Sequence, residues 1–175
     1  MDFRKYNAVD TRIFNIKVIT LSDRCFKGIA EDKGGPLIAE EIGNLMKSKD
    51  CKFDITSTII PDEPDLLRNR IIESVEENCD LIITTGSTGI GPRDIAPETI
   101  KQLLDKEIPG VMEMIRVKYG AEKPNALLSR SVAGIIGQTL IFALPGSPKA
   151  VKEYLFEINK VLFHCFEMIR GEDTH

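Results

Sequence analysis

Residues 80–86 (DLIITTG) form a short, continuous apolar run that passes directly into a glycine-rich loop at 84–94 (TTGSTGIGPRD). Such a run is typical of a strand that is buried on both faces of a parallel sheet. Two more strands are predicted upstream, at 14–22 and 52–60, and each is followed by apolar residues at helical spacing. This alternation predicts an α/β fold in three layers, with a central, mostly parallel sheet flanked by helices.

Prolines mark where the predicted helices begin. Their fixed φ suits the first helical turn, and the positions concerned are Pro36, Pro64, Pro97 and Pro109. Two runs at 131–136 and 139–144 are separated by Gly137-Gln138 and predict one β-hairpin within residues 131–144.

One long final helix is predicted to start at Ser147-Pro148, with the serine as its N-cap. Its apolar residues form a single stripe from Val151 to Ile169, and Gly171 suits a left-handed C-cap. Because the sequence contains no internal repeat and no linker, we expect a single domain over 14–171, preceded by an N-terminal extension at 1–13.

The net charge is slightly negative, with 23 Lys+Arg against 27 Asp+Glu in 175 residues. This balance argues against a general nucleic-acid binder but leaves room for a local phosphate site. The cysteines have neither CxxC nor zinc spacing, which favours small core residues in a reduced, cytoplasmic protein; they are Cys25, Cys51, Cys79 and Cys165.

The start of the chain is charged and lacks an apolar signal region, and no apolar run approaches the ~20 residues that a membrane span requires. We therefore expect neither secretion nor membrane insertion. The two histidines, His164 and His175, lie in or after the last predicted helix, so we expect no histidine-centred catalysis.

Four polar segments follow predicted strands: 22–24, 61–63, 84–94 and 144–147. In open α/β sheets, ligands bind outside the carboxyl ends of the strands. If the strands are parallel, all four segments meet at one edge of the sheet. The sequence therefore predicts a site there.

The glycine-rich loop is the most informative of these segments. Its glycines permit close backbone approach, and successive N–H groups in such a loop form a concavity that suits phosphate oxygens. Hydroxyl groups of Thr84, Thr85, Ser87 and Thr88 add further donors. The loop matches neither the Walker A motif nor the dinucleotide GxGxxG motif. A merely irregular loop is the alternative interpretation.

Asp62 and Asp94 lie at the ends of two of these segments. Carboxylates that face bound phosphates are typical ligands of Mg²⁺, which bridges phosphate oxygens. Alternatively, each is an acidic residue that stabilises the start of the following helix, an effect worth ~0.3–1 kcal/mol.

The segment 144–149 (LPGSPK) places Lys149 in a first helical turn, where a cation opposes the helix dipole. A bound phosphate explains this lysine, and so does simple solvation. Similarly, Asp23 and Arg24 form either part of the site or a local ion pair.

Six short motifs occur in the order and spacing of one known family: SDR (22–24), DKGGP (32–36), PDE (61–63), TTGSTGIGPRD-xx-P (84–97), SR (129–130) and LPGSPK (144–149). With them the chain resembles the molybdenum cofactor biosynthesis family typified by the bacterial MogA and MoaB proteins, whose domain also forms the G domain of gephyrin. The resemblance covers roughly residues 14–170.

The resemblance implies a homotrimeric molybdopterin adenylyltransferase, which uses MgATP to adenylylate the terminal phosphate of molybdopterin and releases pyrophosphate. A molybdenum-inserting enzyme is the implied downstream partner. The family's two aspartates match Asp62 and Asp94, the implied catalytic and Mg²⁺-binding residues. The implied nucleotide- and pterin-binding residues are Ser22, Asp23, Arg24, Thr85, Gly86, Ser87, Thr88, Gly89, Arg93, Pro145, Gly146, Ser147 and Lys149.

One residue departs from the family pattern, which often reads TGGTG where this chain has Ser87. Serine lacks the freedom of glycine at positive φ, so the loop differs there or the hydroxyl reaches a phosphate. Three other functions remain open: a non-catalytic, MoaB-like molybdopterin carrier or scaffold, a domain of a molybdenum-inserting protein, and a nucleotide pyrophosphatase.

Overall fold

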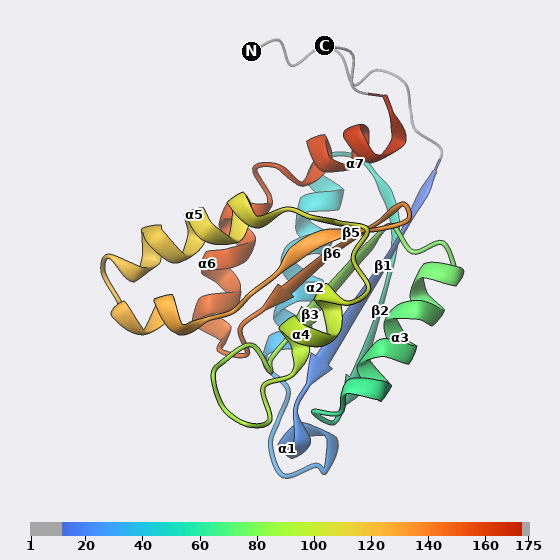
Figure 1. Ribbon diagram of the computed structural model, residues 1–175. Coiled ribbons are helices and arrows are strands. Elements are labelled where there is room, and N and C mark those ends of the chain that lie inside the picture. Colours follow the sequence, from blue (N-terminus) through green and yellow to red (C-terminus); the bar gives the residue numbers. More distant parts are fainter. Residues whose placement is uncertain (1–11, 173–175) are drawn as a thin grey trace.

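Within residues 12–172, which the computed structural model describes, six strands form one sheet in the order β2-β1-β3-β6-β5-β4 (Figure 1). Strands β2, β1, β3 and β6 run parallel, whereas β5 is antiparallel to both of its neighbours. The strands are β1 (Ile13–Leu21), β2 (Lys52–Ile60), β3 (Leu81–Thr85), β4 (Lys106–Glu107), β5 (Ala133–Ile136) and β6 (Thr139–Leu144).

The sheet confirms the predicted α/β class, the mostly parallel arrangement and the β5–β6 hairpin, whose turn has Gly137 at φ +59°. β1 lies between β2 and β3, so the chain leaves β1 toward one side of the sheet and later returns on the other. This reversal makes the carboxyl ends of β1 and β3 the switch point where open α/β sheets bind ligands.

Helices cover both faces of the sheet and complete the three predicted layers (Figure 1). One buried cluster joins α2, α5, α6 and α7 to the face that carries Ile16 and Phe142, and a second joins α3 and α4 to the face that carries Ile82 and Ile141. The helical elements are α1 (Asp23–Phe26), α2 (Gly34–Ser48), α3 (Pro64–Glu76), α4 (Ala96–Lys101), α5 (Pro109–Gly120), the 3₁₀ helix η1 (Pro124–Leu128), α6 (Pro148–Ile158) and α7 (Leu162–Arg170).

The prediction of one long final helix is wrong, because a turn at 159–161 separates α6 from α7. There the N–H groups of Lys160 and Val161 bond three residues back, to Glu157 and Ile158, which tightens and ends the helix. α7 then packs over the start of the sheet, where Phe166 lies 5.1 Å from Phe14 between ring centroids. The apolar stripe continues through the turn, so periodicity alone could not reveal the break.

Other details also differ from the prediction. α2 begins at Gly34 rather than Pro36, β1 already includes Ile13, and α1, β4 and η1 are elements that the sequence did not predict. The predicted extension at 1–13 and His175 lie outside the described residues, except for Arg12 and Ile13. The caps at Ser147 and Gly171 are confirmed. Across residues 12–172, no helix has the length and apolar character that a membrane crossing demands.

Candidate functional site

The ends of β1 and β2 are tied together by two aspartates. The Asp23 N–H donates to Asp62 Oδ2 (3.1 Å), and the Asp62 N–H donates in return to Asp23 Oδ1 (3.2 Å). Asp62 therefore holds the first residue of α1, a neighbouring segment, rather than capping α3, whose N-cap is Glu63. This contact brings two of the four predicted segments together.

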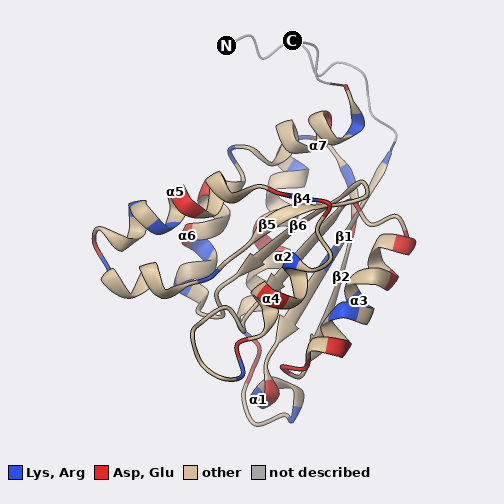
Figure 2. Ribbon diagram, viewed as in Figure 1, with Lys and Arg blue, Asp and Glu red and all other residues tan. Residues whose placement is uncertain are grey.

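Arg93 connects these segments to the glycine-rich loop. Its guanidinium donates to both carboxylate oxygens of Asp23 (2.8–3.1 Å) and to Glu63 Oε1 (3.0 Å). The Arg93 hydrogen bond lowers the pKa of the Asp23 carboxyl, and Asp23 in turn raises the pKa of Arg93, with Glu63 adding to that rise. The ion pair of Asp23 is therefore formed with the distant Arg93, and not with its neighbour Arg24 as one interpretation of the sequence held. Figure 2 shows acidic and basic residues side by side around α1 and the loop before α4.

The loop leaves β3 through two residues at positive φ, Gly86 (+97°) and Ser87 (+57°). A Cβ at Gly86 would lie 2.3 Å from Leu21 O, so only glycine fits there. The Ser87 hydroxyl donates to Arg93 O and accepts from Ile95 N–H, both at 2.9 Å. The hydroxyl proton therefore points to Arg93 O and not to a phosphate, which is the role that one interpretation of the sequence gave it.

Asp94 lies inside the loop rather than at a helix cap. Its Oδ2 accepts from Gly91 N–H at 2.7 Å, and the N-cap of α4 is Ile95. Arg130 also binds the loop, donating from Nε to Gly89 O (2.6 Å) and from a terminal nitrogen to Asp94 O (2.8 Å). The loop is therefore a braced structure, which excludes the alternative of a merely irregular segment.

A cavity of about 240 Å³ opens at the switch point. It is lined by the ends of β1 and β3 and by the start of α2, including Thr20, Ser22, Thr85 and Gly86. Asp32, which no motif argument had singled out as a site residue, lies at its edge. Its carboxylate accepts from Gly34 N–H and Gly35 N–H, both at 3.0 Å, and from the Thr20 hydroxyl at 2.7 Å.

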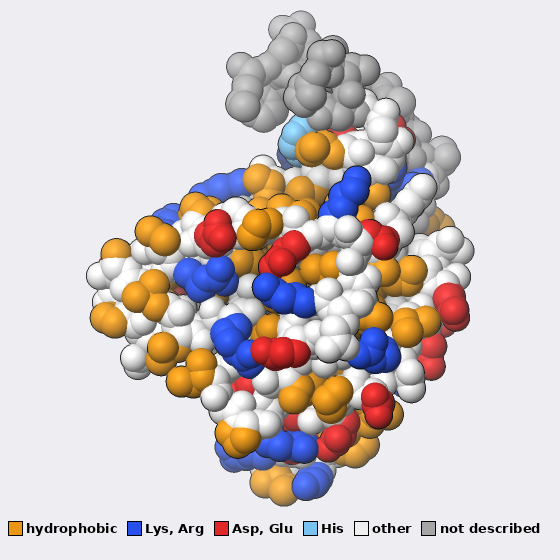
Figure 3. Space-filling model, in the orientation of Figure 1, with side chains coloured by type: hydrophobic (Ala, Val, Ile, Leu, Met, Phe, Trp, Pro, Cys, Tyr) orange, Lys and Arg blue, Asp and Glu red, His pale blue; other side chains and the backbone are white. Residues whose placement is uncertain are grey.

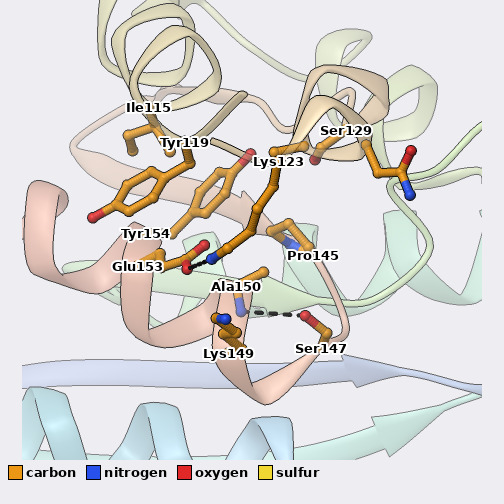
Figure 4. Close-up of a pocket in the computed structure, with 12 residues that line it drawn as sticks. Ile115, Tyr119, Lys123, Ser129, Pro145, Ser147, Lys149, Ala150, Glu153 and Tyr154 are labelled. Atoms are coloured by element: carbon orange, nitrogen blue, oxygen red, sulfur yellow. Dashed lines mark hydrogen bonds and ion pairs between the residues drawn. The ribbon is translucent and has the colours of Figure 1, made fainter. Parts of the chain in front are cut away.

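The β6–α6 turn at 145–149 separates this cavity from a second one of about 270 Å³. Gly146 and Pro148 line the first cavity, whereas Pro145, Ser147 and Lys149 line the second. Figure 4 shows the second cavity between α5, η1 and α6, with Tyr119 and Tyr154 on its wall and Lys123 paired with Glu153. The turn is joined to β3 because Thr85 Oγ1 donates to Pro145 O at 2.9 Å.

The four predicted segments thus meet at one edge of the sheet, but their side chains divide into three groups: an ion-pair cluster around Asp23, the first cavity and the second cavity. Within residues 12–172, the Arg24 side chain forms no hydrogen bond or ion pair. Cys79 is buried in the core, and Cys51 and Cys165 are half-buried and pack against it, so these three fit the predicted core role. Cys25 does not, because it is half-buried at the first cavity.

Comparison with known proteins identifies the chain's relatives. The family model described as "Probable molybdopterin binding domain" matches residues 17–164. The chain belongs to this family. The predicted resemblance to the MogA and MoaB proteins is therefore confirmed, and the matched residues include all four segments of the sheet edge.

Relatives in the molybdopterin binding family match nearly the whole chain. A molybdopterin adenylyltransferase of Helicobacter pylori strain J99 is 37% identical over 158 residues, which are 90% of this chain and 88% of that protein. The molybdenum cofactor synthesis protein cinnamon of Drosophila melanogaster is 38% identical, but the match spans only 26% of its length. The crystal structure of the tungsten cofactor synthesizing protein MoaB of Pyrococcus furiosus is 40% identical, with a TM-score of 0.79 over 91% of this chain and 98% of that one.

Proposed function

We propose that this chain is a molybdopterin adenylyltransferase that transfers AMP from MgATP to molybdopterin. The terminal phosphate oxygen of the pterin forms a bond to the α-phosphorus of ATP, and the bond between the α-phosphorus and the bridging oxygen breaks. Pyrophosphate leaves with that electron pair. The observation that carries the proposal is that Asp23 joins the segment of Asp62 to the glycine-rich loop that contains Asp94, by bonding to Asp62 and to Arg93, in a chain 37% identical to a named molybdopterin adenylyltransferase.

Phosphate binding is assigned to the loop after β3. Within residues 12–172, the consecutive N–H groups of Ser87, Thr88 and Gly89 have no protein acceptor. Successive backbone N–H groups next to a residue in the left-handed region form a concavity for phosphate oxygens. Ser22, Thr85 and Gly146 line the adjoining cavity, and we assign them to nucleotide and pterin contacts together with the other residues implied by the family motifs.

Mg²⁺ fits this edge as a shared ion rather than as a metal held by protein ligands alone. Residues 12–172 contain no group of three or more His, Cys, Asp or Glu side chains that could hold a metal. Mg²⁺ commonly takes only one or two carboxylates and completes its octahedron with waters and substrate phosphates. Asp94 and Asp62 would hold it, and the ion would neutralise the charge that develops on the phosphates.

The other contribution of the protein is to hold charged groups in fixed positions around the reacting phosphates. Arg93, near the end of the loop, is held by Asp23 and Glu63, so its guanidinium has a fixed position without requiring a ligand. Because phosphoryl and nucleotidyl transfer depends mainly on positioning and electrostatic stabilisation, a braced loop is the feature that such chemistry requires.

Purified protein, molybdopterin and MgATP provide the direct test, and the expected products are pyrophosphate and adenylylated pterin. Asp94→Asn retains an acceptor for Gly91 N–H, so it should lower turnover much more than stability. Equal losses of both would make Asp94 a structural residue. Intact pterin binding without product would favour the carrier or scaffold function, and pyrophosphate without pterin would favour a pyrophosphatase.

We further propose a cytoplasmic homotrimer built from one domain over 14–171, with a molybdenum-inserting enzyme as its downstream partner. Exposed apolar side chains gather on α5 and η1, at the left of Figure 3; they are Met114, Val117, Leu127 and Leu128. Such a surface supports association between copies. Sedimentation equilibrium should give about three times 19.5 kDa, and a monomer at micromolar concentration would refute the trimer.

A further inference from the structure

We propose that Ser87 is a positioning residue that fixes Asp94 for the transfer reaction, an inference that rests on the proposed function. The Ser87 hydroxyl bonds to both peptide groups that flank Asp94. It donates to the carbonyl oxygen of Arg93, in the peptide before Asp94, and accepts from the N–H of Ile95, in the peptide after it. A single side-chain oxygen thus sets the orientation of the backbone on either side of the aspartate.

The remaining groups of Asp94 are also held. Its N–H donates to Gly91 O (3.0 Å), its C=O accepts from Arg130 (2.8 Å), and its carboxylate accepts from Gly91 N–H (2.7 Å). The Ser87 carbonyl adds a further bond, because it accepts from Ala96 N–H at 3.1 Å. Ser87 therefore joins the exit of β3 directly to the start of α4 and closes the loop around Asp94.

The backbone conformation of Ser87 supports a role for its side chain. Its φ of +57° lies in the left-handed region, which glycine adopts freely and other L-residues rarely do. Glycine would relieve the strain but has no atom with which to bond to Arg93 and Ile95. The two hydrogen bonds of the hydroxyl therefore offset the cost of this conformation, and glycine could not form them.

Two substitutions test whether the Ser87 hydroxyl is needed or whether serine only occupies a position that glycine would fill equally well. Ser87→Gly removes the hydroxyl and relieves the positive-φ strain, whereas Ser87→Ala removes the hydroxyl and keeps the strain. Both should lower kcat about tenfold or more, because a small displacement of a reacting group can reduce rate ~10²-fold. KM for MgATP should stay within about twofold, because the loss falls on the transition state rather than on binding.

Ser48→Ala is the matched control. The Ser48 hydroxyl also donates to a backbone carbonyl, Leu45 O at 2.6 Å, but it lies at the far end of α2 and is exposed. Its kcat and KM should equal those of the wild type. A Ser87→Gly variant with wild-type or higher kcat would overturn the proposal, because the serine would then be only a strained substitute for glycine.

Hydrogen exchange of the unliganded protein tests the Ser87 hydroxyl bonds to Arg93 and Ile95 without requiring activity. The Ile95 amide should exchange at least about tenfold faster in Ser87→Gly than in the wild type, because it loses its acceptor. Unchanged protection of Ile95 would overturn the proposal even if the enzyme assay succeeded. If the wild type makes no adenylylated pterin, the proposed function fails. Faster Ile95 exchange in Ser87→Gly would still show that the Ser87 hydroxyl holds the backbone around Asp94.

Discussion

Asp32 should stabilise the fold through the start of α2, and Asp32→Ala tests this. The substitution removes one acceptor from two helix N–H groups, those of Gly34 and Gly35, and leaves the Thr20 hydroxyl without its partner. Thr20 is only 6% exposed, so water cannot fully replace that bond. The neighbouring backbone is also fitted to this carboxylate, because a Cβ at Gly35 would lie 2.5 Å from Asp32 Oδ2.

The expected loss follows from these contacts. Removing an N-terminal capping acceptor costs about 0.5–2 kcal/mol, and leaving a nearly buried hydroxyl unpaired adds about 1 kcal/mol. Together they lower the free energy of unfolding by about 1.5–3 kcal/mol, which corresponds to a fall in Tm of about 3–12 °C for a chain of this size. Asp32→Asn keeps an oxygen that can accept from both amides, so its loss should stay below about 1 kcal/mol.

Urea unfolding followed by circular dichroism measures both variants. The midpoint should fall for Asp32→Ala, while the m-value stays unchanged, because the same surface is exposed on unfolding. A loss of less than about 0.5 kcal/mol, the range of an ordinary surface substitution, would refute the capping argument. Equal losses for Ala and Asn would also refute it, since the amide oxygen would then not replace the carboxylate oxygen.

Three more outcomes are expected. Glu157→Gln should lower stability at pH 7 by about 1–3 kcal/mol, because buried Glu157 accepts from Lys118 at 2.6 Å. The hydrogen bond from Lys118 lowers the pKa of Glu157 in the folded state. The stability that the Glu157 carboxylate contributes is therefore complete above its pKa in the unfolded chain, and it is lost as the pH falls through its lower pKa in the folded protein. The urea midpoints of the wild type and Glu157→Gln should accordingly converge in acid. Gly86→Ala should fold poorly by thermal melting, since its Cβ would lie 2.3 Å from Leu21 O. Burial raises the pKa of the Cys79 thiol to about 11, so mass spectrometry should find it unalkylated by iodoacetamide at pH 8 in the native state, but alkylated in urea.

The sheet was predictable because its signals are local. The apolar run at 80–86 and the turn at Gly137-Gln138 each depend on a few neighbouring residues, and each corresponds to an observed element. The meeting of the four segments at one edge also followed, because parallel strands must place their carboxyl ends together. No contact between distant side chains was needed for either conclusion.

The partners within the site were not predictable, because they are chosen by tertiary contact. Asp23 has an arginine beside it in the sequence, yet it pairs with Arg93, seventy residues away. Ser87 carried a visible signal, a serine where the family often has glycine, but only the fold showed that its hydroxyl faces Arg93 and Ile95. Asp32 also carried one, because an acidic residue two positions before Gly34-Gly35-Pro36, where a helix starts, can accept from the first helical N–H groups.

The proposed phosphate site at this sheet edge rests on the loop rather than on helix dipoles. Helix N-termini are ready anion sites only while their N–H groups are free. Here α2 is capped by Asp32, and α6 is capped by Ser147, which accepts from Ala150 N–H. The amide of the first residue of α1 is bound by Asp62. Within residues 12–172, the amides at 87–89 therefore offer three consecutive backbone donors for the proposed phosphate, and Ser87, at φ +57°, is the first of the three.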